Sequence, residues 1–188
     1  AQLESMYKAL QRTQNQNEGS YGFLRDSAIL SIIIVTDEVD CSANENHQAL
    51  VFDRDDSNRV FWEDMGAPVP TSAICWNAGV KCEGAGGTFT SCESQDYNTD
   101  GEEIGAGAAE SDAVLRPVSR YVGLVRGFEQ QKQEINPDQE VIVSMIAGVP
   151  ASGPISYGDS TDPTEQDNFG IGPGCTSSVG GEAQVAYP

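Results

Sequence analysis

Two continuous apolar runs dominate the hydrophobic pattern of this 188-residue chain. Residues 29–36 read ILSIIIVT and residues 141–147 read VIVSMIA, and both runs are rich in β-branched side chains. A strand that is apolar on both faces is typical of a parallel sheet covered by helices on each side. We therefore predict that the two runs form adjacent or near-adjacent parallel strands.

Helical periodicity occurs twice. Residues 2–14 place apolar side chains at helical spacing, and a second helix is predicted over 112–132. Asp112 could cap the second helix, although Pro117 favours a start at Arg116. This helix joins the two strands in a right-handed crossover, which makes the fold α/β. The expected buried stripes are Leu3, Met6, Tyr7 and Leu10 in the first helix and Val114, Val118, Tyr121, Val122, Val125 and Phe128 in the second.

Residues 42–111 form a long insert without clear periodicity. Its one strand-like piece is Val60–Trp62, and Trp62 and Trp76 are expected to build a small local core. A loop of this length in a compact domain is usually functional or covalently stapled. After the second strand, residues 148–175 read as loop, and GGEAQVAY at 180–187 is taken as the start of a last helix.

The cysteines favour disulfides over zinc. None of them forms a CxxC pair, and His47 is the one histidine of the chain. Disulfides imply an oxidising location, which is secreted, periplasmic or at the cell surface. The odd count leaves a free thiol or a partner outside this chain. At least one disulfide is expected within the insert or between it and Cys41; the candidates are Cys41, Cys75, Cys82, Cys92 and Cys175.

The net charge of the chain limits the kinds of partner that it can bind. The net charge of -19 comes from 29 acidic against 10 basic residues. Such a surface repels nucleic acid and anionic membranes and attracts cations or basic proteins. No apolar stretch approaches the roughly 20 residues that a membrane-spanning helix needs.

Three acids follow the first apolar run directly: Asp37, Glu38 and Asp40. Ligands of open α/β sheets bind beyond the carboxyl ends of the strands, and carboxylates there suit Mg²⁺ or Ca²⁺. The alternative is that Asp37 merely ends a buried strand and caps the following loop.

A weaker calcium candidate is the loop that carries Asp53, Asp55, Ser57 and Asp64. It lacks the glycine and the glutamate of a calcium loop, so a solvated acidic turn is the competing interpretation. His47 has no catalytic partner at a suitable spacing. Neighbouring carboxylates would raise the pKa of the Cys41 thiol, which favours a disulfide over a nucleophile.

Several strings together resemble a known family. They are GFLRDSAILSIIIVTDEVDCS, LRPVSRYVGLVRG, AGVP, PGC and GGEA, in this order along the chain. The set resembles the second half of a von Willebrand factor A-type domain, in the cysteine-bearing version of secreted bacterial proteins and lipoproteins. The resemblance implies one Rossmann-like domain over 1–188, with flanking helices and without its N-terminal strands. A separate segment or chain would then supply the missing half.

The same resemblance implies a metal-ion-dependent adhesion site. Asp37 matches the aspartate of the third loop of that site, and Glu38 and Asp40 would lie at its rim. The Asp-x-Ser-x-Ser motif of the first loop does not occur in this chain. A site for Mg²⁺ or Ca²⁺ would therefore be incomplete in this chain alone.

The favoured function is a non-catalytic binding or adhesion module that engages a protein partner. A structural subunit of an extracellular assembly is the alternative. A metal-assisted hydrolase subunit that uses Asp37, Glu38 and Asp40 ranks lower, because no nucleophile or general base accompanies these acids.

Overall fold

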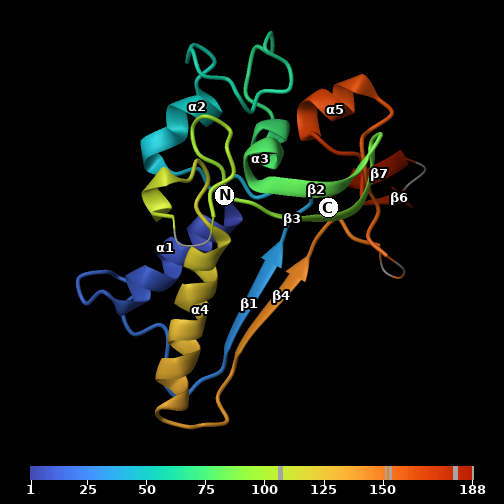
Figure 1. The fold of residues 1–188 in the computed structure, drawn as a ribbon. Helices are drawn as coiled ribbons and strands as arrows, with labels where there is room; N and C mark the ends of the chain where they lie inside the picture. The colour runs from blue at the N-terminus through green and yellow to red at the C-terminus, as the bar shows by residue number, and fades with distance from the viewer. Residues whose placement is uncertain (106–107, 151, 153, 180–181, 188) are drawn as a thin grey trace.

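The computed structural model describes residues 1–105, 108–150, 152, 154–179 and 182–187. Strands β1 (Leu30–Val35) and β4 (Val141–Ile146) pair in parallel, with Leu30 opposite Val141 and Val35 opposite Ile146. Helix α4 (Val118–Gln133) connects back to β4 and runs alongside both strands (Figure 1). The predicted parallel pair and the helix between its strands are confirmed.

The first helix, α1 (Gln2–Gln14), matches its predicted range, whereas α4 begins later than expected. Pro117 is the N-cap of α4, because a proline inside the helix would remove a hydrogen bond. Asp112 instead ends a separate 3-10 helix, η2 (Glu110–Asp112). Tyr121 and Phe128 are buried as predicted, but Val118 and Val122 of the same stripe are 42% and 40% exposed.

The expected helical layer on both faces of the parallel strands is not present among the described residues. Ile34 is buried on one face, whereas Ile33 and Val35 on the other are 65% and 67% exposed. The pair also stays two-stranded in the described part of the chain. The structure therefore shows a mixed α/β fold with a parallel pair, and it does not show a full Rossmann-like sheet.

The insert is more regular than its sequence suggested. It contains η1 (Glu45–His47), α2 (Gln48–Phe52), α3 (Ser72–Gly79) and the antiparallel hairpin β2 (Val80–Ala85) to β3 (Thr88–Ser94). Gly86 and Gly87 both have positive φ, as the two central residues of a tight hairpin turn require. The predicted strand at Val60–Trp62 was wrong: it is a turn whose Phe61 and Trp62 are buried.

The largest group of fully buried side chains lies in the insert rather than around the parallel strands. It combines side chains of α2 and α3 with the turn at Phe61, and it confirms that Trp62 belongs to a local core. Its buried members are Leu50, Val51, Phe61, Trp62, Ile74, Cys75, Ala78 and Val114. Trp76 lies in a second cluster with Ile171 and Tyr187.

The two ends of the insert meet at a short paired segment, residues 42–44 and 113–116, which we call the neck. Asn44 N–H donates to the Val114 carbonyl at 2.9 Å, and Arg116 N–H donates to the Ser42 carbonyl at 2.8 Å. The fully buried Asn44 side chain also donates to the carbonyls of Glu110 and Ala113 at 3.1 and 3.0 Å. These bonds close the insert, and none of them involves a residue of β1 or β4.

Polar side chains fasten the helices to the rest of the chain. Buried Glu4 of α1 accepts a hydrogen bond from Tyr121 Oη and lies 3.4 Å from Arg120 Nε, both on α4. At the far end of α4, buried Lys132 donates through Nζ to the Arg25 and Ala28 carbonyls just before β1. Charged hydrogen bonds of this kind are the stronger ones in proteins.

The C-terminal region has strands where a helix was expected. It contains β5 (Tyr157–Gly158), which pairs with β3, then α5 (Pro163–Phe169) and the hairpin β6 (Cys175–Val179) to β7 (Glu182–Ala186). The prediction of a last helix over 180–187 was therefore wrong for residues 182–187, while 180 and 181 lie outside the described residues. Residues 182–185 alternate polar and apolar side chains, which is the spacing of a strand rather than that of a helix.

Two disulfides are formed, Cys41–Cys75 and Cys82–Cys92. The first links the loop after β1 to α3 in the insert core, and the second joins opposite residues of the β2–β3 hairpin. This confirms the expected stapling of the insert. Cys175 of β6, grouped with the disulfide candidates, is free in the structure, in agreement with the odd count.

Replacing Asn44 by alanine should lower the free energy of unfolding by about 2 to 4 kcal/mol, since it leaves buried carbonyls of the neck without a donor. Urea unfolding followed by fluorescence would measure the change. Asn136→Ala is the matched control, because Asn136 is exposed and caps only a local turn. Equal losses for the two variants would contradict the role assigned to the neck.

Removing the Cys41–Cys75 disulfide should destabilise the chain more than removing Cys82–Cys92. The sequence separations are 34 and 10 residues, and loop entropy alone makes the difference about 1 kcal/mol. Unfolding of the two double alanine variants would test the order.

Alkylation of the unreduced wild-type protein should label one thiol, and labelling of four or five would overturn both pairings.

Candidate functional site

The carboxyl end of β1 is shaped by Thr36. Its N–H donates to the Ile146 carbonyl at 2.9 Å, which continues the parallel pairing past the strand ends. Its hydroxyl donates to the Glu38 carbonyl and accepts bonds from Glu38 N–H and Gln2 Nε2. The chain consequently makes a tight turn that carries Asp37 at its exposed tip.

Asp37 has an exposed side chain for which no hydrogen-bond or ion-pair partner occurs within the described residues. Its main-chain carbonyl accepts a bond from Tyr187 N–H at 3.0 Å, so the C-terminal segment passes beside the strand end. The Tyr187 ring stacks on Phe169. Burial and then the carboxylate of Glu165 raise the pKa of the Tyr187 phenol, which stays neutral at physiological pH.

The other two acids are engaged in structure. Glu38 accepts a hydrogen bond from the Ser72 hydroxyl at 2.9 Å, which connects the strand end to the first residue of α3. Asp40 is half-buried and accepts bonds from Leu3 N–H at 3.0 Å and Ser42 N–H at 3.1 Å. Asp40 thus satisfies an otherwise free N–H in the first turn of α1, which is a capping role.

A cavity of about 260 Å³ lies beside this turn, between the loop after β1 and the β2–β3 hairpin, which crosses beyond the strand ends (Figure 1). Asp40, Asp96 and Arg116 contribute polar groups to its largely apolar wall. Burial raises the pKa of the Asp96 carboxyl above its ordinary value. No pattern in the sequence marks Asp96, because one acid within a polar insert has no distinguishing neighbours.

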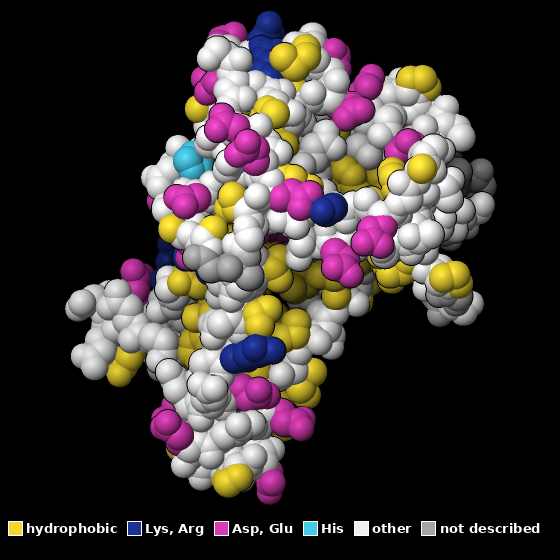
Figure 2. Space-filling view, viewed as in Figure 1, with side chains coloured by type: hydrophobic (Ala, Val, Ile, Leu, Met, Phe, Trp, Pro, Cys, Tyr) yellow, Lys and Arg dark blue, Asp and Glu magenta, His cyan; other side chains and the backbone are white. Residues whose placement is uncertain are grey.

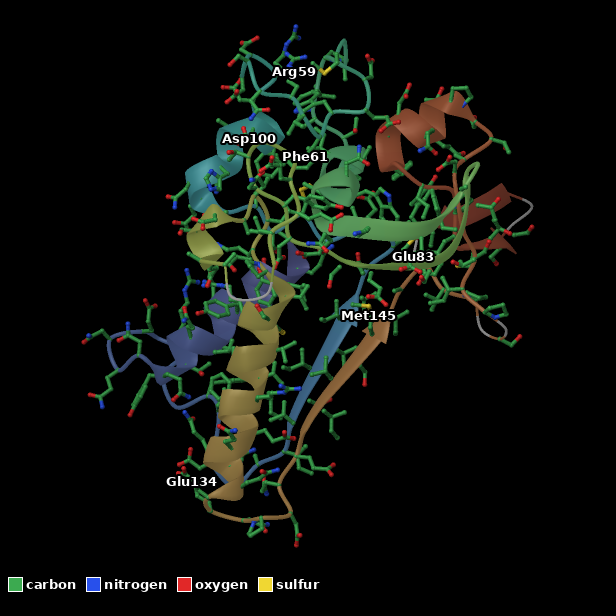
Figure 3. All side chains as sticks on the ribbon, in the orientation of Figure 1. Arg59, Phe61, Glu83, Asp100, Glu134 and Met145 are labelled. Carbon is green, nitrogen blue, oxygen red and sulfur yellow. A yellow bond between two sulfur atoms is a disulfide. The ribbon has the colours of Figure 1, made fainter. Side chains whose placement is uncertain are left out.

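The weaker calcium candidate has no convergent ligands in the described structure. Asp53 accepts from Asp55 N–H at 2.9 Å, and Asp64 accepts from Gly66 N–H at 2.7 Å. Each carboxylate therefore caps its own turn, and Asp53, Asp55, Ser57 and Asp64 are all exposed. Turns of this kind match the alternative of a solvated acidic loop. Figure 3 shows this part of the insert around Arg59 and Phe61, at the end of the molecule far from Glu134.

His47 lies in η1, where its Nε2 is 2.8 Å from the Ser111 carbonyl oxygen. This nitrogen must donate to a carbonyl, so the ring helps to hold η2 against η1 rather than facing Asp37. Cys41 is occupied by its disulfide. Among the described residues, neither side chain forms a hydrogen bond or ion pair with Asp37, Glu38 or Asp40.

The donor set does not fit a complete site for Mg²⁺ or Ca²⁺. Within the described residues, no group of three or more His, Cys, Asp or Glu side chains has a metal-binding arrangement. Asp37 offers one carboxylate, whereas Thr36, Glu38 and Asp40 already have hydrogen-bond partners. Further ligands would have to come from another segment or chain, because hard cations take six or more oxygens.

Comparison with family models, with curated proteins and with solved structures gave no match. The likeness to von Willebrand factor A domains therefore rests on the motifs quoted above and stays a prediction. No helix of the described part of the chain is long and apolar enough to cross a membrane. The two disulfides are typical of proteins from oxidising compartments.

Mg²⁺ or Ca²⁺ should raise the thermal unfolding midpoint of this chain only marginally, since Asp37 supplies one free carboxylate. Scanning calorimetry of the wild type, Asp37→Ala and the control Asp26→Ala, each with and without cation, would measure the effect. A large shift in the wild type and Asp26→Ala that disappears in Asp37→Ala would show instead that the chain carries a complete site.

Proposed function

We propose that this chain is a non-catalytic binding module of a secreted or cell-surface protein, of the von Willebrand factor A type. The observation that carries the proposal is the exposed carboxylate of Asp37, held at the tip of a fixed turn beyond the carboxyl end of β1. Ligands of α/β sheets are bound at this edge. The resemblance of residues 22–42 to the family supports the same location.

The charge of the chain suggests the chemistry of the partner. Asp37 and Glu38 are both exposed, and the chain as a whole has a net charge of -19. A protein surface rich in lysine and arginine would be drawn to this edge and held there by ion pairs with carboxylates. The proposal does not require a bound cation.

A second candidate is a structural subunit of an extracellular assembly. It is favoured by the uncovered face of the β1–β4 pair, where Ile33, Val35 and Ile146 are each more than half exposed. Apolar surfaces of this kind are usually buried against another protein in the functional state. In the first candidate function the partner binds at the carboxyl end of β1, and in the second it binds the uncovered face of the β1–β4 pair.

Replacing both Asp37 and Glu38 by alanine should weaken partner binding at least about tenfold, which corresponds to roughly 1.4 kcal/mol. The immobilised wild type and variant would be compared by biolayer interferometry against purified envelope and secreted proteins of the producing organism. Asp26→Ala/Asp138→Ala is the matched control, because it removes two exposed acids at the opposite end of the strands. Binders that do not distinguish the wild type from the Asp37/Glu38 variant would refute the proposal.

A further inference from the structure

The cavity of about 260 Å³ beside the turn after β1 has an apolar wall that four parts of the chain build together. Leu3 comes from α1, Trp76 from α3, Val80 from β2 and Leu115 from the neck. Figure 2 shows hydrophobic side chains gathered below the β2–β3 hairpin, between it and the strands. Since a protein cavity of about 150 Å³ holds a benzene ring, this one has room for about ten non-hydrogen atoms.

Disulfides and main-chain bonds hold the walls of this cavity in place. Cys75 and Cys92 both line it, and each belongs to one of the two disulfides. Ser42 and Arg116 line it from the neck, where their main chains are hydrogen-bonded to each other. A ligand that enters a cavity with fixed walls does not have to order any loop, so little of its binding energy is lost.

The charged side chains of the lining are three acids and one base, namely Asp40, Glu93, Asp96 and Arg116. The Arg116 guanidinium already donates to Glu110 Oε1 at 2.8 Å, and Glu110 lies outside the lining. The Asp40 carboxylate already accepts bonds from two main-chain N–H groups. The cavity therefore has an excess of negative charge, which favours a cation over an anion as its occupant.

Asp96 is the half-buried acid of this lining. Within the described residues no ion-pair or hydrogen-bond partner occurs for its carboxylate. Its main-chain carbonyl, by contrast, accepts bonds from Ile104 N–H and Gln95 Nε2, both at 2.9 Å, which fix the position of the residue. Burial without a compensating cation raises the pKa of the Asp96 carboxyl. An ammonium group beside this carboxylate would offset the unfavourable burial of its charge.

We propose that this cavity binds a small organic ammonium ion whose apolar body is a single ring with a short chain. The apolar body packs against Trp76, Val80 and Leu115, and the ammonium group pairs with the Asp96 carboxylate. The ring of Tyr157 also lines the cavity, and aromatic rings attract cations as well as apolar groups. The ligand is a small molecule held by residues other than Asp37, so the inference goes beyond the proposed binding of a protein partner.

Phenethylamine is the probe, because it is an ammonium ion at neutral pH and matches the size of the cavity. NMR titration of the isotopically labelled whole chain should show saturable shifts of the amide signals of Val80, Asp96 and Leu115. Hydrocinnamate has nearly the same shape and the opposite charge, and it should bind at least about tenfold more weakly. Ethylamine has the charge without the ring and should also bind at least about tenfold more weakly.

Asp96→Asn keeps the shape of the side chain and removes its charge. It should weaken phenethylamine binding at least about tenfold and leave hydrocinnamate binding no weaker. Asp100→Asn is the matched control, since Asp100 is an exposed acid of the same insert that does not line the cavity. The thermal midpoint of Asp96→Asn should equal or exceed that of the wild type, because the substitution removes an unpaired, half-buried charge.

Two substitutions on α4 test whether the ligand occupies the cavity. Val118 lines the cavity and is 42% exposed, whereas Val122 is 40% exposed and does not line it. Val118→Trp should fill part of the cavity and weaken phenethylamine binding at least about tenfold. Val122→Trp adds the same side chain outside the cavity and should leave binding unchanged. Both variants should stay folded, because both valines are partly exposed.

Equal affinity for phenethylamine and hydrocinnamate would overturn the proposal, as would equal effects of Asp96→Asn and Asp100→Asn. The absence of saturable shifts at millimolar phenethylamine would also overturn it. Asp37→Ala/Glu38→Ala changes no residue of the cavity lining, so this variant should bind phenethylamine as the wild type does. Failure of the proposed partner binding is therefore distinguishable from failure of the cavity to bind the amine.

Discussion

The neck of the insert is the contact on which the rest of this structure depends. Between Ser42 and Arg116 the chain makes a long excursion and returns to within hydrogen-bond distance of its start. Closing a loop of this length has an entropic cost, which grows slowly with loop length. The main-chain bonds of the neck, the buried Asn44 amide and the Cys41–Cys75 disulfide together hold the return point in place.

The insert and the β1–β4 pair differ in how much of their apolar surface is buried. The insert contains the larger cluster of buried side chains, whereas β1 and β4 show much of their apolar surface to solvent. Stability is therefore concentrated in the part with the least apolar sequence pattern. The strands with the most apolar sequence instead expose Ile33, Val35 and Ile146 to solvent.

The sequence predicted what depends on apolar periodicity. The runs at 29–36 and 141–147 gave β1 and β4, and the helical spacing of residues 2–14 gave α1. The β2–β3 hairpin was missed because its apolar face is short: Val80, Cys82 and Cys92 pack against the second cluster, and polar residues separate them in the sequence. In retrospect, its signal was the glycine pair at 86 and 87 between two cysteine-bearing segments, which is typical of a tight turn.

The position of Asp37 in the fold was predictable, whereas the surroundings of this residue were not. The end of an apolar run followed by Asp37 predicted that this residue lies beyond the carboxyl end of β1, where the structure has it. That Asp40 caps α1 could not be read from the sequence, because it depends on a helix 37 residues earlier folding against the same loop. Asp96 reaches the neighbouring cavity through the path of the insert, which no local pattern encodes.

The closed neck also has a consequence for how the chain can change over evolution. Because the insert begins and ends at the same place, residues can be added to or removed from its distant turns without displacing β1 or α4. An insert attached in this way can change its surface while the surface of the β1–β4 pair stays the same. Length variation in relatives of this protein should accordingly concentrate between residues 45 and 109, and the paired residues that close the neck should vary little.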